Sequence, residues 1–259
     1  MKEVIVAENL TKEYFKSFKY KKEGLTKEVT VALDGISFKI YDGEFISIMG
    51  PSGSGKSTFV NLISTIDSPT KGKIFINGKR TSGLSETALS KLRSETIGFV
   101  FQDFNLIDNL TISENISVPL KLSGISLKEI KERISDISEK LNISEILEKY
   151  PAECSGGQIQ RCAIARALIN NPKVIIADEP TGNLDSVNSK IILNIFKELN
   201  EKFGITILIV THDPLTASYS KKTINIIDGK IEKSIERKDL SQREYFDKIL
   251  NLVSGEIDI

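Results

Sequence analysis

The sequence has few cysteines, no surplus of either charge and no long hydrophobic run. Its 259 residues include two cysteines, Cys154 and Cys162, and their spacing matches no zinc-binding pattern. We therefore expect two reduced thiols in a cytosolic protein rather than a disulfide scaffold. Basic and acidic residues both number 35, so the composition gives no general bias toward nucleic acid or anionic lipid.

Apolar runs are short along the whole chain. One of the longest, ITILIV at 205–210, is far below the roughly 20 residues that a membrane-spanning helix needs. The N-terminal stretch MKEVIVAENLTKEY has no apolar segment of the length that a secretory signal requires. We expect a chain that is soluble when isolated and that reaches a membrane only through a partner.

Short β-rich runs alternate with longer helical patterns, which predicts a mostly parallel sheet with helices on its faces. A helix is expected at 56–66, and the region 103–155 is amphipathic and helical, mainly over 113–124 and 126–150. Strands are expected at 3–10, 30–40, 44–49, 72–79, 96–102, 173–178 and 205–212, with a terminal hairpin over 223–233.

A glycine-rich stretch, GPSGSGKS at 50–57, fits the phosphate-binding pattern G-x-x-x-x-G-K-[ST]. It follows an expected strand and opens an expected helix, so its backbone N–H groups and the positive helix end would surround phosphates. Lys56 would reach the β- and γ-phosphates, and Ser57 would hold Mg²⁺. The nucleotide-binding residues expected in this loop are Gly50, Pro51, Ser52, Gly53, Ser54, Gly55, Lys56, Ser57 and Thr58.

Two further motifs suit the same chemistry. A buried strand over 173–178 ends in the carboxylates Asp178 and Glu179. Asp178 would bind Mg²⁺, and Glu179 would orient and deprotonate the attacking water. Near residue 155, a serine and two glycines precede a second helical run, so free N–H groups there would form a second anion site.

Taken in chain order, the motifs resemble those of the ATP-binding cassette (ABC) ATPases over about residues 3–230. The residues that carry the resemblance are Gly50–Thr58, Gln102 in FVFQDF, Ser155-Gly156-Gly157-Gln158, Asp178-Glu179, Asp185 in GNLDS and His212 in VTHD. The resemblance implies an α/β fold with a P-loop NTPase (RecA-like) core of mostly parallel sheet. It also implies an N-terminal antiparallel β subdomain and an α-helical insert. The expected parts are an ATP-binding core with the β subdomain at 1–102 and 156–230, a helical subdomain at 103–155, and a C-terminal extension at 231–259.

The same resemblance implies how the two anion sites cooperate. In ABC ATPases two cassettes dimerise head to tail with ATP, and the SGGQ segment of each caps the nucleotide on the other. Ser155, Gly156, Gly157 and Gln158 are therefore expected to contact the partner's nucleotide, with Asp185 at the dimer seam. Gln102 is expected to sense Mg²⁺ and water, and His212 to hydrogen-bond the γ-phosphate. Tyr14 is expected to stack on adenine, with Phe15, Phe18 and Tyr20 as rival candidates.

A narrower resemblance concerns the kind of transporter. Stretches such as IGFVFQDFNL and THDPLTASYS are similar to the lipoprotein-release and macrolide-efflux subgroup, and most similar to ATPases of bacitracin-type peptide-antibiotic resistance transporters. The implied partner is an integral-membrane permease at the cytoplasmic face of the plasma membrane, whose cytoplasmic helix would sit in a groove formed largely by 103–122. Lipoprotein-release, macrolide-efflux or cell-division ATPases are the alternatives. A soluble ABC ATPase acting on nucleic acid or ribosomes is more remote, and no nucleic-acid partner is expected.

Three features remain open at this stage. Cys154 stands where the family usually has leucine, a position expected to serve packing. The basic segment 14–30 is expected to be a solvated hairpin tip, or else a contact with a membrane partner or acidic lipid. Ser241 and Glu244 form a capping-box pattern before a C-terminal helix. Phe246, Ile249, Leu250 and Val253 are expected to dock this helix on its own domain, or else on a partner.

Overall fold

The structure is a computed structural model, which describes residues 2–21 and 24–255 and, within 18–21 and 24–27, the backbone alone. The predictions made for residues 256–259 and for the rings of Phe18 and Tyr20 concern parts that the structure does not describe. Among the helices that the structure describes, none has both the length and the apolar content to span a bilayer.

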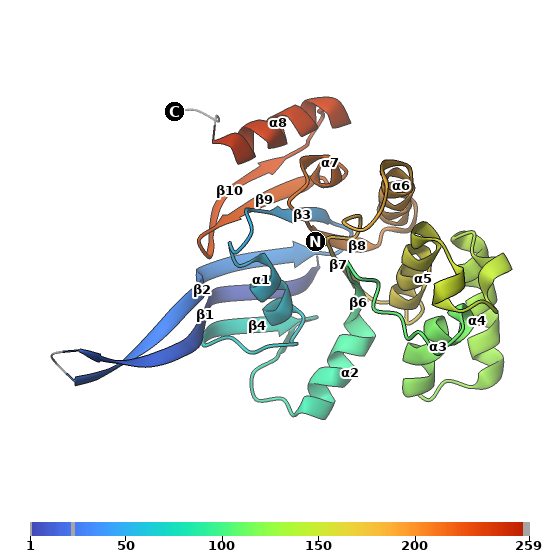
Figure 1. Cartoon of the computed structure of the whole chain (residues 1–259), viewed down its shortest axis with the longest axis horizontal. Coiled ribbons are helices and arrows are strands. Elements are labelled where there is room, and N and C mark those ends of the chain that lie inside the picture. The colour runs from blue at the N-terminus through green and yellow to red at the C-terminus, as the bar shows by residue number, and fades with distance from the viewer. Residues whose placement is uncertain (1, 22–23, 256–259) are drawn as a thin grey trace.

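The chain forms two sheets (Figure 1). The first is antiparallel, in the order β2-β1-β4-β5, and consists of β1 (Glu3–Lys21), β2 (Gly24–Tyr41), β4 (Lys71–Ile76) and β5 (Lys79–Arg80). The second has the order β10-β9-β3-β8-β7-β6 and is parallel except for β10 at its edge. Its strands are β3 (Phe45–Met49), β6 (Ile97–Val100), β7 (Val174–Asp178), β8 (Thr206–Val210), β9 (Lys222–Ile227) and β10 (Lys230–Glu236).

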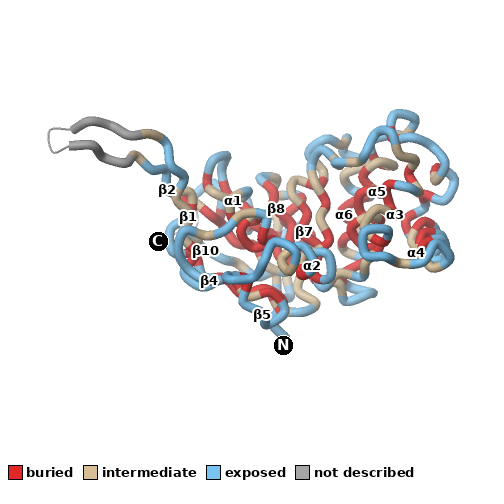
Figure 2. Tube along the Cα trace, turned by 90° about the horizontal axis from the view of Figure 1, so that it is seen from below, coloured by how far each residue is buried: buried red, intermediate tan, exposed pale blue. Residues whose placement is uncertain are grey.

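The parallel sheet is buried on both faces. Every residue of β3 and β8 is buried, which explains why these strands are apolar except for Ser47 and Thr206 and do not alternate. Along β7, Val174 and Ile176 contact the cluster of α1 (Lys56–Ile63) and the antiparallel sheet, whereas Ile175 and Ala177 face the helices on the opposite side. Those helices are α5 (Gly156–Leu168) and α6 (Ser186–Phe203) (Figure 2). The α/β class and its mostly parallel core are confirmed.

The helical insert lies at one end of the molecule (Figure 1). It contains α3 (Ile112–Leu122), α4 (Leu127–Lys140) and two short 3₁₀ turns, Ser144–Ile146 and Pro151–Glu153. The continuous helix expected over 126–150 is wrong in its second half. The helix ends at Lys140 because Asn142 adopts a left-handed conformation, with φ of 52°.

Two other expectations need correction. Helix α2 (Glu86–Thr96) was not expected, and only Leu92 and Thr96 of its residues are buried, so the sequence carries little periodic signal. The segment around 14–30 does form the expected hairpin, since β1 and β2 stay paired to Lys21 and from Gly24. The expected C-terminal extension also begins inside β10, whose residues belong to the main sheet.

The C-terminal helix α8 (Gln242–Ser254) docks on its own domain, with Ile249 buried as expected but with two of its expected docking residues exposed. Ser241 and Glu244 do form a capping box. The buried residues are Tyr245, Ile249 and Leu252, and the exposed fractions of Leu250 and Val253 are 41% and 47%. The Tyr245 hydroxyl donates to Thr223 Oγ1 at 2.8 Å, and this buried hydrogen bond fixes which face of the helix turns inward.

Candidate functional site

The expected catalytic residues follow four neighbouring strands of the parallel sheet. The glycine-rich loop follows β3, Gln102 follows β6, Glu179 follows β7 and His212 follows β8. Carboxyl ends of parallel strands meet at one edge, where α/β proteins bind ligands. A cavity of about 370 Å³ lies there, lined by Ala32, Ser52, Gly53, Gly55, Lys56, Ser57, Thr58, Gln102, Asp178, Glu179 and His212.

The loop at 50–57 can adopt its shape only because of its glycines. Gly50 has φ of 151°, and a Cβ there would lie 2.1 Å from the Ile226 carbonyl oxygen. Gly55 has φ of 102°, and a Cβ there would lie 2.4 Å from the Ala32 carbonyl oxygen. Gly55 is also the N-cap of α1 and offers no side-chain cap, so the first N–H groups of the helix remain open to an anion.

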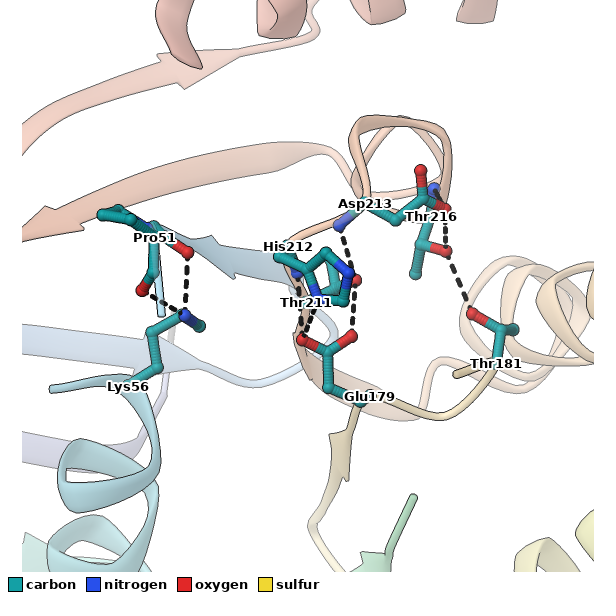
Figure 3. Close-up of polar contacts among 9 residues, drawn as sticks. Pro51, Lys56, Glu179, Thr181, Thr211, His212, Asp213 and Thr216 are labelled. Carbon is teal, nitrogen blue, oxygen red and sulfur yellow. Dashed lines mark hydrogen bonds and ion pairs between the residues drawn. The ribbon is translucent and has the colours of Figure 1, made fainter. Parts of the chain in front are cut away.

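The Lys56 side chain hydrogen-bonds to the backbone of the 50–57 loop and stabilises its shape. Its Nζ donates to the Gly50 and Pro51 carbonyl oxygens at 2.7 and 2.8 Å (Figure 3). Burial lowers the pKa of Lys56, and the nearby carboxylates of Glu179 and Asp178 oppose that shift. An anion bound at the loop would favour the charged ammonium in the same way.

Asp178 has the environment of a cation ligand. Burial raises the pKa of its carboxyl group, the neighbouring Glu179 raises it further, and Lys56 partly offsets both effects. A bound divalent cation would reverse this shift by stabilising the carboxylate. Ser57, Gln102 and Asp178 line one cavity and offer hydroxyl, amide and carboxylate oxygens, the donor set that Mg²⁺ prefers. The residues present therefore fit a magnesium ion.

The Glu179 carboxylate makes three hydrogen-bond contacts with the two residues that follow β8 (Figure 3). Its Oε1 accepts from the His212 backbone N–H at 3.1 Å and lies 2.7 Å from His212 Nδ1, and its Oε2 accepts from Thr211 Oγ1 at 3.1 Å. Because a carboxylate only accepts, we assign the proton of this contact to Nδ1. The sequence predicted His212 next to a γ-phosphate, and it did not reveal this Glu179–His212 pairing.

A further hydrogen-bond chain connects the two loops beside Glu179 (Figure 3). The Asp213 backbone N–H donates to Thr211 Oγ1 at 3.0 Å, and Asp213 Oδ2 accepts from Thr216 Oγ1 at 2.7 Å. Thr216 Oγ1 lies 3.1 Å from Thr181 Oγ1, on the loop that follows Glu179. Asp213 caps the short helix α7 (Pro214–Ala217). The Asp-Pro pair at 213–214 is the one sequence signal that could have indicated this helix start and its hydrogen bonds.

Gln102 is packed against the loop that follows β7. A Cβ on Gly182 would lie 3.0 Å from Gln102 Nε2, and the Gln102 carbonyl oxygen accepts from Asn183 Nδ2 at 3.1 Å. On its other side, Arg166 of α5 donates to the Phe104 carbonyl oxygen at 2.8 Å. Gln102 therefore contacts the loop that follows Glu179, and it directly precedes the segment that Arg166 of α5 holds.

The second anion site is formed at the start of α5, separately from the first. Ser155 is the N-cap, its Oγ accepts from the Gln158 N–H at 3.4 Å, and Gln158 Oε1 accepts from the Ser155 N–H at 2.8 Å. Gln158 therefore caps its own helix. Ser155 and Gly156 are exposed, and neither they nor Gly157 line the cavity of the 50–57 loop. Within one chain the two sites are not brought together.

Asp185 lies near this second site, where it caps the N-terminus of α6. It caps α6 by accepting from the Val187 and Asn188 N–H groups, both at 2.9 Å, and hydrogen bonds from Asn188 and Val187 lower its pKa. Asn188 also limits the residue opposite it, since a Cβ on Gly157 would lie 2.2 Å from Asn188 Oδ1. The starts of α5 and α6 are therefore in direct contact, and a larger residue at 157 would require the Asn188 side chain to move.

Tyr14 is fixed by two residues that the sequence did not single out. Its hydroxyl donates to Asp67 Oδ2 at 3.1 Å, and Lys12 Nζ lies 2.7 Å from Asp67 Oδ1 and 5.0 Å from the centre of the Tyr14 ring. Burial opposes ionisation of Asp67, but hydrogen bonds from Lys12, Ser68 and Tyr14 outweigh it and lower the pKa of this carboxyl group. Tyr14 does not line the cavity of the 50–57 loop, and its ring is 40% exposed.

A sequence profile described as "ABC transporter" matches residues 33–182. The chain belongs to the ABC transporter family. It is 48% identical over 223 residues to the ABC transporter ATP-binding protein YxdL of Bacillus subtilis, covering 86% of each chain. It is 45% identical over 218 residues to the bacitracin export ATP-binding protein BceA of Halalkalibacterium halodurans, covering 84% of this chain and 86% of that one.

A solved structure is similar to this ABC ATPase over nearly the whole chain. It is a dimeric, post-hydrolysis state of the ATP-binding cassette MJ0796, of Methanocaldococcus jannaschii, bound to ADP and inorganic phosphate. The TM-score is 0.80 at 39% sequence identity, covering 92% of this chain and all of the other. The cassette fold and the assignment as an ATPase are thereby established for this chain.

We predict that Lys56→Ala reduces ATP hydrolysis by at least about a hundredfold, because it removes the cation nearest the expected β- and γ-phosphates. Phosphate release from purified protein measures the effect. Lys202→Ala serves as the control, since Lys202 is exposed on α6 and its ion pair is with Glu198 of the same helix. Wild-type turnover in Lys56→Ala would contradict the assignment of the 50–57 loop.

We predict that Tyr14→Ala weakens nucleotide binding by about 1–3 kcal/mol, the range for aromatic stacking on a base, and by less than Lys56→Ala. Asp67→Asn should weaken binding less, and should add nothing in a chain that already carries Tyr14→Ala, because it acts through the tyrosine. Titration with a fluorescent ATP analogue gives the affinities. Unchanged affinity in Tyr14→Ala would assign the adenine contact to Phe15, Phe18 or Tyr20.

Proposed function

We propose that two copies of this chain form two composite ATP sites, head to tail, and power a separate membrane permease. The observation that carries the proposal is the separation of two open anion sites within one chain. The loop at 50–57 presents the N-terminus of α1, and Ser155-Gly156 presents the N-terminus of α5 outside that cavity. A second copy would bring its α5 to the first copy's nucleotide, so that each γ-phosphate meets both helix ends.

Within each composite site the residues have distinct proposed tasks. Lys56 would bind the β- and γ-phosphates. Ser57, Gln102 and Asp178 would hold Mg²⁺, which would supply positive charge beside the phosphates. Glu179 orients the attacking water and takes its proton. The three contacts from Thr211 and His212 fix the Glu179 carboxylate while it waits for that water. His212, whose side chain is 73% exposed, can turn to the γ-phosphate once nucleotide arrives.

A second cavity, of about 420 Å³, suits a helix of the permease. It lies between α2, β6, α3 and α5 and is lined by Ile66, Ser90, Arg93, Ser94, Ile97, Gly98, Phe99, Phe101, Asn105, Pro119, Arg166, Ala167 and Asn170. The segment 103–122 contributes Asn105 and Pro119 to the lining, less than expected, because α2, β6 and α5 together form most of the wall. The rings of Phe99 and Phe101 stack with centroids 4.6 Å apart, and Phe101 directly precedes Gln102. A permease helix that displaced Phe101 would therefore also move Gln102, the next residue of the chain.

The proposed biological role is resistance to cell-wall-active peptide antibiotics of the bacitracin or lantibiotic type. The support is the resemblance of the sequence around Gln102 and His212 to such ATPases, and the 45% identity to a bacitracin export protein. The ATPase would then be held at the cytoplasmic face of the plasma membrane through its permease. A neighbouring gene for a permease with a large extracellular domain would support the assignment.

We predict that Glu179→Gln is a monomer without nucleotide and a dimer with ATP, but not with ADP, because the γ-phosphate is the shared contact. The amide keeps the shape of the pocket and removes the base, so ATP binds without being cleaved. Analytical ultracentrifugation measures the change. Ser155→Arg, added to the same chain, should block the dimer by filling the gap at the γ-phosphate.

A mixture of single variants provides the matched control for the composite site. Lys56→Ala and Ser155→Arg chains should each be inactive alone, whereas their mixed dimer assembles one site with both motifs intact. Partial recovery of hydrolysis on mixing is expected. A Glu179→Gln chain that stays monomeric at saturating ATP, or full activity in Ser155→Arg, would show that α5 does not serve a partner's nucleotide.

We predict that cells lacking this protein become more sensitive to bacitracin or to a lantibiotic, because the permease loses its energy source. Growth inhibition across a panel of such peptides measures the effect, and complementation by the Lys56→Ala chain is the negative control. Unchanged sensitivity together with a defect in lipoprotein release or cell division would favour the alternative transporters.

A further inference from the structure

The hairpin formed by the end of β1 and the start of β2 extends well away from the body of the molecule (Figure 1). We call its residues 12–21 and 24–31 the arm. Strand β1 pairs with β4 only as far as Thr11, and beyond that point the described strands of the arm form backbone pairs only with each other. Side chains tie the base of the arm to the body, since Lys12 and Tyr14 contact Asp67 and the Glu13 N–H donates to Thr70 Oγ1 at 3.0 Å. An isolated two-stranded hairpin is marginally stable in water, so the arm is expected to gain stability from a surface outside this chain.

We propose that the arm docks on the helical insert of a second copy of this chain and closes the adenine side of the composite site. This inference rests on the proposed head-to-tail dimer and adds a contact to it. The proposed contact on the partner is the segment 144–153, which leads directly into Ser155.

The origin of the arm places it at the rim of the nucleotide cavity. Ala32 lines the cavity of the 50–57 loop, and its carbonyl oxygen packs against Gly55. Val31, the next residue along β2, already belongs to the arm. On β1, Tyr14 at the base of the arm is the proposed adenine contact. A surface that approaches the nucleotide from outside would therefore meet the arm first.

The symmetry of the proposed dimer brings the arm to the insert. The arm and the helical insert lie at opposite ends of the long axis, the arm beyond α1 and the insert beyond α5 (Figure 1). A twofold rotation that faces each loop with the partner's Ser155 also faces each arm with the partner's insert. The arm is then continuous with the interface that the two anion sites define.

The two surfaces are complementary in charge. The arm contains five lysines and two glutamates, a formal net charge of +3, and Lys16 Nζ lies 3.8 Å from Glu28 Oε1 within it. Residues 144–153 contain three glutamates and one lysine, a net charge of −2. On α4 the acids Glu129 and Asp136 pair with basic neighbours, whereas the exposed Glu145 and Glu148 have no such partner among the described residues.

The two surfaces also offer apolar area for contact. On one face of the arm, Phe15 lies opposite Val29 and is followed across the strands by Val31, with exposed fractions of 52%, 37% and 50%. On the insert, Tyr150 is 48% exposed within the acidic segment. Burial of such side chains stabilises an interface, and the charges select the partner.

The test uses the full chain carrying Glu179→Gln, in which ATP holds the dimer. Replacing residues 16–28 by Asn-Gly shortens the arm, because Phe15 and Val29 are directly opposed and a two-residue turn can join them. We expect the dissociation constant of the ATP-bound dimer to rise by at least about tenfold, the effect of losing a few partly buried ion pairs and their apolar support. The dimer is measured at saturating ATP, because residues 16–28 include the rival adenine contacts Phe18 and Tyr20. An unchanged circular-dichroism spectrum of the monomer shows that the shortened chain folds.

Charge reversal gives an independent test that leaves the backbone intact. Lys16→Glu, Lys19→Glu and Lys27→Glu together should weaken the dimer, as should Glu145→Lys with Glu148→Lys. Both sets in one chain should restore it, because the attraction is re-formed with the signs exchanged. Lys202→Glu, Lys238→Glu and Lys248→Glu make the same charge change on exposed residues elsewhere and should have no effect.

The outcomes separate this proposal from the composite site. If the parent Glu179→Gln chain stays monomeric with ATP, the composite site and the arm contact both fail. If the parent dimerises and the shortened arm leaves its dissociation constant unchanged, the arm contact alone is wrong. Loss of binding to phosphatidylglycerol vesicles with unchanged dimerisation would overturn the proposal as well, and would assign the arm to the membrane surface.

Discussion

One partly buried ammonium faces two carboxylates at the edge of the parallel sheet, and the rest of the fold holds them there. The carboxylates of Asp178 and Glu179 favour the charged form of Lys56, whereas burial disfavours the charged forms of Lys56 and Asp178. An anion beside Lys56 and a cation beside Asp178 would stabilise both charged forms. The continuous apolar strands β3, β7 and β8 keep the charges in position, because their burial on both faces leaves little freedom at their carboxyl ends.

The residues that cap α5 and α6 are also those expected at the dimer seam. Ser155 caps α5 and Asp185 caps α6, so the side chains expected at the dimer seam already satisfy backbone groups of their own chain. This local use keeps the start of each helix ordered before any partner arrives. A preordered surface loses less conformational freedom on association, which favours rapid and reversible closure.

The sequence predicted the central strands and the cavity residues because both depend on local patterns. Apolar runs that end in Gly50, Asp178 or His212 place those residues at one sheet edge without further information. The misses are contacts between distant segments. Tyr14 meets Asp67 across 53 residues and Glu179 meets His212 across 33, and no spacing rule encodes either pair. The buried face of α8 was missed for a similar reason, since Tyr245 is selected by Thr223 on another element.

The close packing of Gly157 on Asn188 gives the ATPase a mechanical property. Asn188 belongs to the first turn of α6, which follows the loop after Glu179, and Gly157 belongs to the first turn of α5. A shift of the loop beside one bound nucleotide would therefore displace the helix that reaches toward the other. Within the proposed dimer, this rigid contact would make the two sites report to each other, so that each turnover depends on the occupancy of both.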